Sequence, residues 1–378
     1  MDYAKLALAK HLELRGKISI SLKDDLDSRE KLSMYYTPGV GEVSNYISKH
    51  PDKARDYTWL NNSIAVISDG SAVLGLGNIG PLGALPVMEG KCMLFKHFAG
   101  IDAVPIVLDV HSADEIVAAV KAIAPSFGGI NLEDIAAPIC FEVEKRLKAE
   151  LPIPVMHDDQ HGTAVVVLAG LINACKATGR KLSDAKIVVA GAGAAGTAIV
   201  KLLHAYANPR IFVVDSKGVI SRNRRDLNQE KKHLLKYSNL SGIDGSLQDI
   251  LQGADTFIGV AQAGLLSVDM VNSMDKNPII FALANPTPEI MPDVAKAAGV
   301  AVIATGRSDF PNQVNNALAF PGIFRGALDN KVTAITDAHK IAAAEAIARL
   351  VKKPDATHIV PSILEPKVVS SVAATIHD

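Results

Sequence analysis

Several features that define other classes of protein are scarce in this chain of 378 residues. Its three cysteines, Cys92, Cys140 and Cys175, lie far apart and form no CxxC pair. This pattern argues against a disulfide scaffold and a structural zinc site. Aromatic residues make up only 5% of the chain, but apolar residues make up 48%. The composition therefore predicts large cores of aliphatic side chains.

An excess of one charge and long apolar runs are lacking too. The formal net charge is −1, so nothing indicates binding to nucleic acid or to an anionic membrane. The longest apolar run, residues 164–172, is too short to span a bilayer. The first residues are amphipathic and include Asp2, unlike a secretory signal. We therefore expect a soluble, cytoplasmic protein with neither nucleic-acid nor membrane partners.

A glycine-rich motif follows the apolar run 187–190 and opens a helical pattern. Gly191 permits a tight turn, Gly193 lets the backbone approach a pyrophosphate, and Gly196 lets the helix pack on the strand. A second apolar run ends in Asp215, whose carboxylate can accept the hydroxyls of an adenosine ribose. This order predicts a site for a nicotinamide dinucleotide. Its candidate residues are Gly191, Ala192, Gly193, Ala194, Ala195, Gly196, Asp215 and Asn285.

A second motif of the same spacing, Gly75 to Gly80, lacks this context. Pro81 and Gly83 follow it at once, so we do not expect a long helix to start there. No strand that ends in an acid follows at the right distance. We interpret the motif as a glycine-rich loop whose backbone takes conformations that other residues resist.

The order of apolar runs predicts an α/β fold with two domains and a helical end. Residues 1–160 begin with helices and continue with a small parallel sheet. Residues 161–330 form a doubly wound, Rossmann-type domain that opens with a helix at 161–178. Residues 331–378 are helices that pack back beside the first domain. The expected strands are 64–67, 92–95, 104–108, 155–156, 187–190, 211–215, 256–260, 279–283 and 300–304, with helices at 113–123 and 135–147.

Two acidic pairs, Glu133-Asp134 and Asp158-Asp159, allow two interpretations. Acids stabilise helix N-termini, so the first pair could simply open a helix and Asp159 could cap one that starts near Gly162. If the two pairs converge, they form an all-oxygen cage suited to Mg²⁺ or Mn²⁺. Amides after predicted strands, Asn285 and Asn315, favour contact with a substrate.

Six ordered segments resemble the malic enzymes, specifically the short prokaryotic form. They begin at Tyr36 (YTPGVG), Asp69 (DGSAVLGLGNIG), Pro86 (PVMEGK), Asn131 (NLED), His157 (HDDQHGT) and Ala284 (ANPTP). The resemblance runs from about residue 10 to the C-terminus. It implies oxidative decarboxylation of L-malate to pyruvate and CO₂ through oxaloacetate and enolpyruvate. It also implies NAD(P)⁺, a divalent metal ion and a homodimer.

The resemblance further implies roles for single residues. Glu133, Asp134 and Asp159 would bind Mg²⁺ or Mn²⁺. Lys91 would contact the substrate and act as the general base. Its pKa would be lowered by the metal ion and by burial.

Four further residues have implied roles. Tyr36 would be the acid that protonates C3 of enolpyruvate, and Asp158 would orient Lys91 or the metal ligands. Asn285 and Asn315 would hold the substrate. Without the resemblance, Tyr36 would be interpreted as a packed turn residue and Lys91 as a solvated lysine before a strand.

Cofactor choice, the partner of one carboxylate and the reaction type are left open. Asp215 favours NAD⁺ because it repels a 2′-phosphate, whereas Lys217, Arg222, Arg224 and Arg225 could accommodate NADP⁺. Longer malic enzymes carry an arginine for a malate carboxylate where this chain has Ala72. A basic group from a neighbouring subunit could serve instead. The alternatives are a malolactic-type lyase without net redox change, usually a longer protein, and a nucleotide-binding sensor without chemistry.

Overall fold

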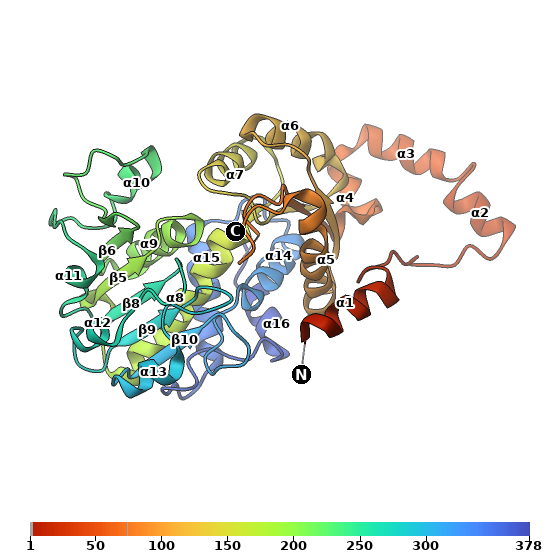
Figure 1. The fold of residues 1–378 in the computed structure, drawn as a ribbon. Coiled ribbons are helices and arrows are strands. Elements are labelled where there is room, and N and C mark those ends of the chain that lie inside the picture. The colour runs from red at the N-terminus through yellow and green to blue at the C-terminus, as the bar shows by residue number, and fades with distance from the viewer. Residues whose placement is uncertain (1–2, 74) are drawn as a thin grey trace.

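Two parallel sheets covered by helices form two lobes, which confirms the expected α/β fold class (Figure 1). The structure is a computed structural model that describes residues 3–73 and 75–378. Asp2, used above in the argument about secretion, lies outside the described residues. So does Leu74, which belongs to the segment that begins at Asp69.

Residues 3–49, here called the N-terminal arm, contain the helices α1 (Tyr3–Leu14), α2 (Arg29–Tyr35) and α3 (Val40–Lys49). None of these three helices has a buried residue. Figure 1 shows α2 and α3 projecting away from both lobes. Three short elements lead from the arm to the first sheet: η1 (Pro51–Lys53), α4 (Ala54–Tyr57) and η2 (Trp59–Asn61).

The first lobe contains a parallel sheet of order β2-β1-β3-β4. Side chains alternate across its central strand, as the geometry of a strand requires. Ala65 and Ile67 pack with α6 and α7, whereas Ile64 and Val66 pack with α5. The elements are β1 (Ser63–Ser68), α5 (Gly80–Ala99), β2 (Asp102–Val107), α6 (Ala113–Ile123), η3 (Ala124–Ser126), β3 (Gly129–Leu132), α7 (Ile139–Glu150) and β4 (Val155–His157).

Helix α5 contradicts two of our expectations. It is 20 residues long and begins directly at the glycine-rich loop, with Pro81 in its first turn. Proline fits there because the first N–H groups of a helix have no intrahelical partner. The expected strand 92–95 lies inside this helix, because residues buried at helical spacing were interpreted as a strand. The loop itself matches the prediction, since Gly75, Gly77 and Gly80 have φ of 78°, 76° and 70°.

The expected helix at 135–147 was placed too early. Glu133 and Asp134 do not open a helix, since they directly follow β3 and α7 begins only at Ile139. Strand β3 was missed because its four residues start with a glycine and lack a clear alternating pattern. Both acids therefore lie at the carboxyl end of a strand.

Helix α8 (Asp158–Thr178) runs through the core between the lobes and starts three residues earlier than predicted. By length and composition alone, α8 could cross a membrane. However, 67% of its most apolar window is buried inside the protein. Packing against both sheets therefore accounts for its apolar character.

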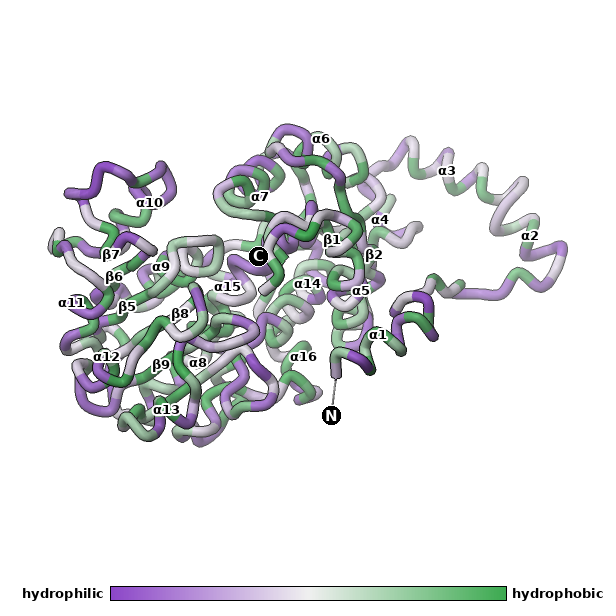
Figure 2. Tube along the Cα trace, in the orientation of Figure 1, coloured by the Kyte–Doolittle hydropathy of each residue, from purple (hydrophilic) through white to green (hydrophobic). Residues whose placement is uncertain are grey.

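The second lobe contains a sheet of order β10-β9-β8-β5-β6-β7, parallel except for β7. Figure 2 shows hydrophobic strands in this lobe and a hydrophilic loop around α10. Strand β7 was not expected because it has only two residues. The elements are η4 (Leu182–Asp184), β5 (Lys186–Ala190), α9 (Ala194–Ala207), β6 (Arg210–Asp215), β7 (Gly218–Val219), α10 (Gln229–Leu234), α11 (Leu247–Leu251), β8 (Thr256–Gly259), α12 (Val268–Asn272), β9 (Ile279–Ala282), α13 (Pro292–Ala297) and β10 (Val302–Thr305).

After β10 the chain returns to the first lobe. The elements are η5 (Asn316–Leu318), α14 (Phe320–Asp329), α15 (Asp337–Leu350) and α16 (Lys367–Ala373). Helix α14 packs on α5, where the ring of Phe95 lies 4.6 Å from that of Phe320 and 5.5 Å from that of Phe324. Helix α15 packs on α8 and α9, and α16 packs on α14 and α15. These helices close the junction between the lobes.

Candidate active site

A pocket of about 490 Å³, here called the interlobe pocket, lies between the lobes. Both sheets are parallel, so their loops at the carboxyl ends can meet around one hollow. The first lobe contributes Ala72, Gly75, Asp134, Ile135 and Ala137, and α8 contributes Asp159 and Thr163. The second lobe contributes the glycine turn and the two predicted amides, Asn285 and Asn315.

Glu133, Asp134 and Asp159 converge at the first lobe's side of this pocket. Each offers a carboxylate oxygen, and the three oxygens lie within 4.8 Å of one another. Strands β3 and β4 are neighbours, so the residues that follow them meet at one edge of the sheet. The backbone N–H of Asp134 also donates to Oδ2 of Asp159 at 2.7 Å. The two acidic pairs therefore do converge.

The electrostatics of this cluster favour a cation. Burial raises the pKa of Asp159 to about 6, and Asp158 adds to the shift while Lys91 opposes it. Burial likewise raises the pKa of Glu133. A divalent cation would offset the repulsion between these carboxylates. Three carboxylate oxygens are also the ligand type that Mg²⁺ and Mn²⁺ prefer, so the donor set fits the implied metal.

Lys91 lies on α5 and is buried beside the acidic cluster. Its Nζ lies 2.7 Å from Oδ2 of Asp158 and 2.9 Å from Oε1 of Glu133. Burial alone lowers the pKa of Lys91, but these carboxylates outweigh it and raise the pKa above its usual value. The expected lowering relied on the positive charge of a metal ion as well as on burial, and burial by itself does not outweigh the carboxylates. The interpretation of Lys91 as a solvated residue was wrong.

Asp158 connects Lys91 to the segment that follows β10. Its Oδ2 also accepts a hydrogen bond from Nδ2 of Asn316 at 2.5 Å. A Cβ at Gly162 would lie 1.9 Å from its Oδ1, so only glycine leaves room for this carboxylate. The sequence analysis assigned no role to Asn316, and it considered Gly162 only as the start of a helix. A single sequence contains no signal that links either residue to Asp158.

The glycine turn between β5 and α9 forms the second lobe's side of the pocket. Gly191 has a φ of 117°, and a Cβ there would lie 2.6 Å from the carbonyl oxygen of Val260. A Cβ at Gly196 would lie 1.9 Å from the carbonyl oxygen of Gly191. Larger residues would therefore disrupt the turn. The pocket is lined by Gly193, Ala194 and Ala195, and Ala192 packs on the core beneath.

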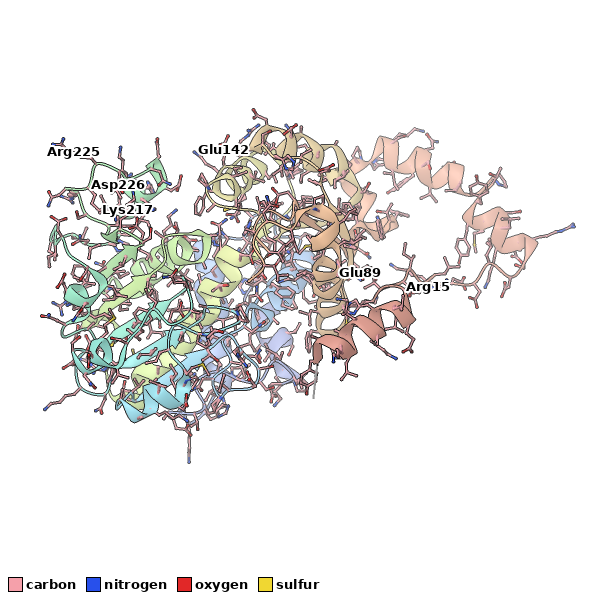
Figure 3. The ribbon with its side chains drawn as sticks, viewed as in Figure 1. Arg15, Glu89, Glu142, Lys217, Arg225 and Asp226 are labelled. Carbon is pink, nitrogen blue, oxygen red and sulfur yellow. The ribbon has the colours of Figure 1, made fainter. Side chains whose placement is uncertain are left out.

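Asp215 at the end of β6 is engaged by two cations. Arg224 donates to both of its carboxylate oxygens, at 2.7 and 3.0 Å, and Lys231 donates at 2.7 Å. Although burial acts in the opposite direction, these bonds lower the pKa of Asp215 to about 2. Nearby, Lys217 pairs with Asp226 at 3.0 Å, at the outer end of the lobe (Figure 3). The sequence had indicated Arg224 but not Lys231.

Glu289 is a buried residue that the sequence analysis missed. Its carboxylate accepts the backbone N–H of Ala261 and that of Ala284, each at 3.0 Å. It thereby ties together the turns after β8 and β9, both of which line the interlobe pocket. A Cβ at Gly259 would lie 2.4 Å from its carboxyl carbon. These partners meet only in the folded sheet, so the sequence pattern does not reveal them.

Asn285 and Asn315 line the interlobe pocket from the second lobe. Asn315 also caps η5, because its Oδ1 accepts the backbone N–H of Ala317 at 2.9 Å. Nδ2 of Asn285 donates to the carbonyl of Leu283 at 3.4 Å. The structure therefore brings both amides to the same hollow as Asp134 and Asp159.

Tyr36 is the one predicted catalytic residue that the structure does not bring to this site. It follows α2 in the N-terminal arm and is 67% exposed. It is not one of the described residues that line the interlobe pocket. The arm makes no buried helix face that would hold it against α5. The structure therefore does not bring Tyr36 and Lys91 of one chain together.

The fold and the site define a two-lobed α/β protein with a dinucleotide-type glycine turn facing a buried lysine and a carboxylate cluster. Residues 15–148 match the family model "Malic enzyme, N-terminal domain", and residues 160–377 match "Malic enzyme, NAD binding domain". The chain belongs to the malic enzyme family.

Individual relatives agree with this assignment. A protein of Bacillus subtilis, named "Bifunctional malic/malolactic enzyme", is 53% identical over 100% of this chain and 92% of its own. An "NAD-dependent malic enzyme" of Geobacillus stearothermophilus is 53% identical over 96% of this chain and 76% of its own. The crystal structure of an NAD-dependent malic enzyme from Thermotoga maritima superposes with a TM-score of 0.95, at 48% identity and 98% coverage of both chains.

Proposed function

We propose that this protein catalyses the oxidative decarboxylation of L-malate to pyruvate and CO₂ with reduction of NAD(P)⁺. The observation that supports it most directly is the contact of Lys91 with Asp158 and Glu133, beside three converging carboxylates and across a pocket from the glycine turn. A nucleotide-binding sensor without chemistry would have no need to keep a buried lysine among four acids.

The proposed chemistry assigns a task to each side of the pocket. When bound by Glu133, Asp134 and Asp159, a Mg²⁺ or Mn²⁺ ion would supply Lewis-acid polarisation of the C2 oxygen, and the dinucleotide would accept the hydride. When a bound metal ion offsets the negative charge of the neighbouring carboxylates, Lys91 in its neutral form would take the proton of the C2 hydroxyl.

The remaining residues orient the reacting groups. Asp158 lies 2.7 Å from Nζ of Lys91 and thereby orients this side chain. Asn285 and Asn315, which line the interlobe pocket, hold the substrate.

The test of this function is absorbance at the NADH band with purified protein, L-malate and Mn²⁺, comparing NAD⁺ with NADP⁺. Growth of the reduced cofactor that a chelator abolishes, with stoichiometric pyruvate, is the expected result. Binding of NAD⁺ without turnover of malate would favour the sensor instead.

A malolactic activity is the second candidate, because the relative from Bacillus subtilis is named as bifunctional. Length does not separate the two activities, since the match covers 92% of that relative. Lactate formed from malate without net NADH would identify the malolactic reaction. Pyruvate formed together with NADH would identify the malic enzyme reaction, and both products together would indicate a bifunctional protein.

We further propose that the protein is a homodimer in which Tyr36 of one chain completes the pocket of the other. Tyr36 is exposed on an arm that projects from its own lobes, and apolar side chains such as Leu12 and Ile20 are exposed on the same arm. A second copy is the occupant that would both cover these side chains and supply the acid missing beside Lys91. There Tyr36 protonates C3 of enolpyruvate.

Mixing two inactive variants tests this arrangement. In a dimer formed by one Tyr36→Phe chain and one Lys91→Ala chain, one of the two sites would combine an intact Tyr36 with an intact Lys91. Random exchange of subunits should therefore restore about one quarter of the wild-type activity. If both residues act within one chain, no activity would return, although the dimers form.

Cofactor choice depends on how firmly Asp215 is held. Because Arg224 and Lys231 already pair with its carboxylate, its repulsion of a 2′-phosphate is reduced. We propose NAD⁺ as the preferred cofactor, with NADP⁺ as a substrate that Arg224 tolerates. An Arg224→Leu variant should lose about tenfold in kcat/KM for NADP⁺ while that for NAD⁺ changes little. An equal loss with both cofactors would contradict this role.

We expect the protein to act in the cytoplasm on a small molecule, without nucleic-acid or membrane partners. Its three cysteines are all free and buried, as suits a reducing compartment. Fractionation of cells that express the tagged protein would test this location.

A further inference from the structure

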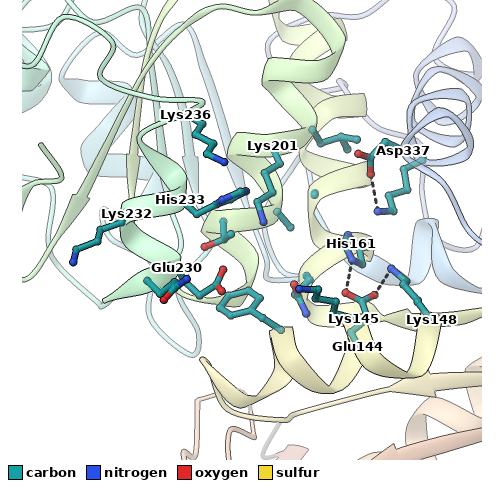
Figure 4. A pocket seen from close by; sticks show the side chains of 18 residues that line it. Glu144, Lys145, Lys148, His161, Lys201, Glu230, Lys232, His233, Lys236 and Asp337 are labelled. Atoms are coloured by element: carbon teal, nitrogen blue, oxygen red, sulfur yellow. Dashed lines mark hydrogen bonds and ion pairs between the residues drawn. The ribbon is translucent and has the colours of Figure 1, made fainter. Parts of the chain in front are cut away.

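A second cavity, of about 930 Å³, lies between the lobes and is also bordered by α8. Residues 159 and 163 line the interlobe pocket, whereas residues 160, 161 and 164 line this second cavity. Residues four apart share a helix face, so the two hollows lie on different faces of one helix. Helix α7 of the first lobe and helices α9 and α10 of the second form further walls (Figure 4). We call it the basic cavity.

Lysines dominate the walls of the basic cavity. Six lysines line it, against three acidic residues. Two of the six are paired, Lys148 with Glu144 at 2.6 Å and Lys340 with Asp337 at 2.9 Å. The other four form no ion pair with any described residue. These four are Lys145 from α7, Lys201 from α9, Lys232 from α10, and Lys236, which follows α10.

Two buried polar side chains in these walls also lack partners. Gln160 and Thr197 are 4% and 2% exposed and line the cavity. Nε2 of Gln160 and Oγ1 of Thr197 make no hydrogen bond to other described residues. Buried polar atoms without partners cost free energy, which a bound ligand can recover. Burial, and then the charges of Lys201 and Lys236, lower the pKa of His233, in agreement with a positive field.

We propose that the basic cavity binds a small polyanion with a di- or triphosphate group, bridging α7 of the first lobe and α9 and α10 of the second. Four unpaired ammonium groups match the three or four charges of such a group. The volume exceeds what phosphate groups need, and Phe141 and Leu202 offer an apolar surface to an organic part. None of residues 191–196 lines this cavity, so it is separate from the dinucleotide turn. The site goes beyond the proposed function and does not depend on it.

Glu144 connects this cavity to the catalytic residues. Its carboxylate accepts the backbone N–H of His157 at 3.0 Å. It also contacts Nε2 of His161 at 2.9 Å (Figure 4). His157 directly precedes Asp158 and Asp159. A phosphate group in the basic cavity that attracts Lys148 weakens the ion pair between Lys148 and Glu144. The bound polyanion also bridges the two lobes and restrains their movement relative to each other. Binding of the polyanion therefore changes the affinity of the interlobe pocket for malate.

Calorimetric titration with inorganic tripolyphosphate tests the site directly. Metal-free buffer and saturating NAD⁺ keep the probe away from metal ions and from the dinucleotide site. We expect one equivalent to bind to wild type, and the double variant Lys201→Ala/Lys236→Ala to bind about tenfold or more weakly. The control Lys352→Ala/Lys353→Ala removes two exposed lysines elsewhere and should bind like wild type.

The absence of binding to wild type, or equal affinity in all three proteins, would overturn the proposal. If the double variant does not fold, the single variants Lys145→Gln and Lys232→Gln, which alter exposed side chains, decide the same question. ATP should bind at least as tightly as tripolyphosphate. Citrate has similar charge but only carboxylates, so tighter binding of citrate would overturn the assignment to phosphate.

A separate kinetic measurement tests the connection between the basic cavity and the interlobe pocket through Glu144. With Mn²⁺ in excess over the probe, tripolyphosphate should change the KM for malate in wild type but not in Lys201→Ala/Lys236→Ala. An unchanged KM in a wild-type protein that binds the probe would overturn this connection. Because binding is measured without turnover, failure of the site and failure of the proposed function remain distinguishable.

Discussion

The two lobes and the N-terminal arm differ in how far their apolar side chains are buried. In the lobes, strands such as β1 are buried at every position, and even the charged Lys91 is only 8% exposed. In the arm, Leu12 is 82% exposed, Ile20 91% and Tyr36 67%. Most of the exposed large hydrophobic side chains among the described residues belong to residues 3–59. The lobes form a closed core, whereas the arm offers an apolar surface that its own chain does not cover.

The same division applies to the proposed chemistry. The base Lys91 and the three candidate metal ligands meet within one chain, because neighbouring parallel strands end at the same edge. The proposed acid Tyr36 lies outside that edge, on the arm. Changes in the lobes should therefore act within each chain, whereas changes in the arm should act through the assembly.

The largest expected effect lies in the lobes. Asp159→Asn removes one carboxylate of the metal cluster and should lower kcat/KM for malate by about 10⁴-fold, since a catalytic metal supplies several kcal/mol of charge stabilisation. Binding of Mn²⁺, measured by calorimetry, should weaken in parallel. Asp269→Asn, an exposed acid of the second lobe, is the matched control. Unchanged Mn²⁺ affinity in Asp159→Asn would remove this residue from the metal site.

A smaller loss is expected from the arm. Tyr36→Phe removes one hydroxyl and should lower kcat by about 10³-fold, as is typical for loss of a general acid. The affinity for Mn²⁺ and the dimer should stay intact, because the metal ligands lie in the lobes. Tyr3→Phe, which alters another exposed tyrosine of the arm, should be silent. Full activity of Tyr36→Phe would show that the arm does not supply the catalytic acid.

A third change tests whether the arm acts through assembly. Leu8 and Leu12 are exposed one helical turn apart on α1, so Leu8→Asp/Leu12→Asp should not destabilise a single chain. It should raise the dissociation constant of the dimer by about a hundredfold, because a buried, unpaired charge costs a few kcal/mol. Sedimentation velocity over a range of concentrations measures this. Leu364→Asp, which alters an exposed leucine outside the arm, is the control. If Leu8→Asp/Leu12→Asp leaves the dissociation constant of the dimer unchanged, the interface lies elsewhere.

The smallest effect concerns pH and the lobes alone. A carboxylate binds a cation in its ionised form, and the pKa of the candidate metal ligand Asp159 is about 6. Mn²⁺ should therefore bind with its full affinity well above pH 6. Below pH 6 the affinity should fall by about tenfold per pH unit for each proton that the Mn²⁺ ion displaces. Calorimetry at pH 7 and pH 5 checks this. The Leu8→Asp/Leu12→Asp variant should give the same profile, and a flat profile would contradict the raised pKa values.

Patterns local in the sequence were predictable. The glycine turn and Asp215 were recognised because a strand, a tight turn and a helix follow one another within about thirty residues. The convergence of Glu133 and Asp134 with Asp159 was anticipated only as one of two interpretations. Lys91 was placed before a strand because Cys92 to Phe95 form an apolar run, although the run is a short part of the long helix α5. A run of four apolar residues does not distinguish a strand from a buried helix.

By itself, the sequence determined the family, the α/β class and the set of charged groups available for chemistry, because motifs and apolar periods follow from neighbours along the chain. Only the tertiary structure decided which groups meet. It placed Asn316 and Gly162 against Asp158, Glu289 between two turns, and four unpaired lysines around one cavity. It also separated Tyr36 from Lys91. These relations depend on the packing of segments distant in sequence, which no local pattern encodes.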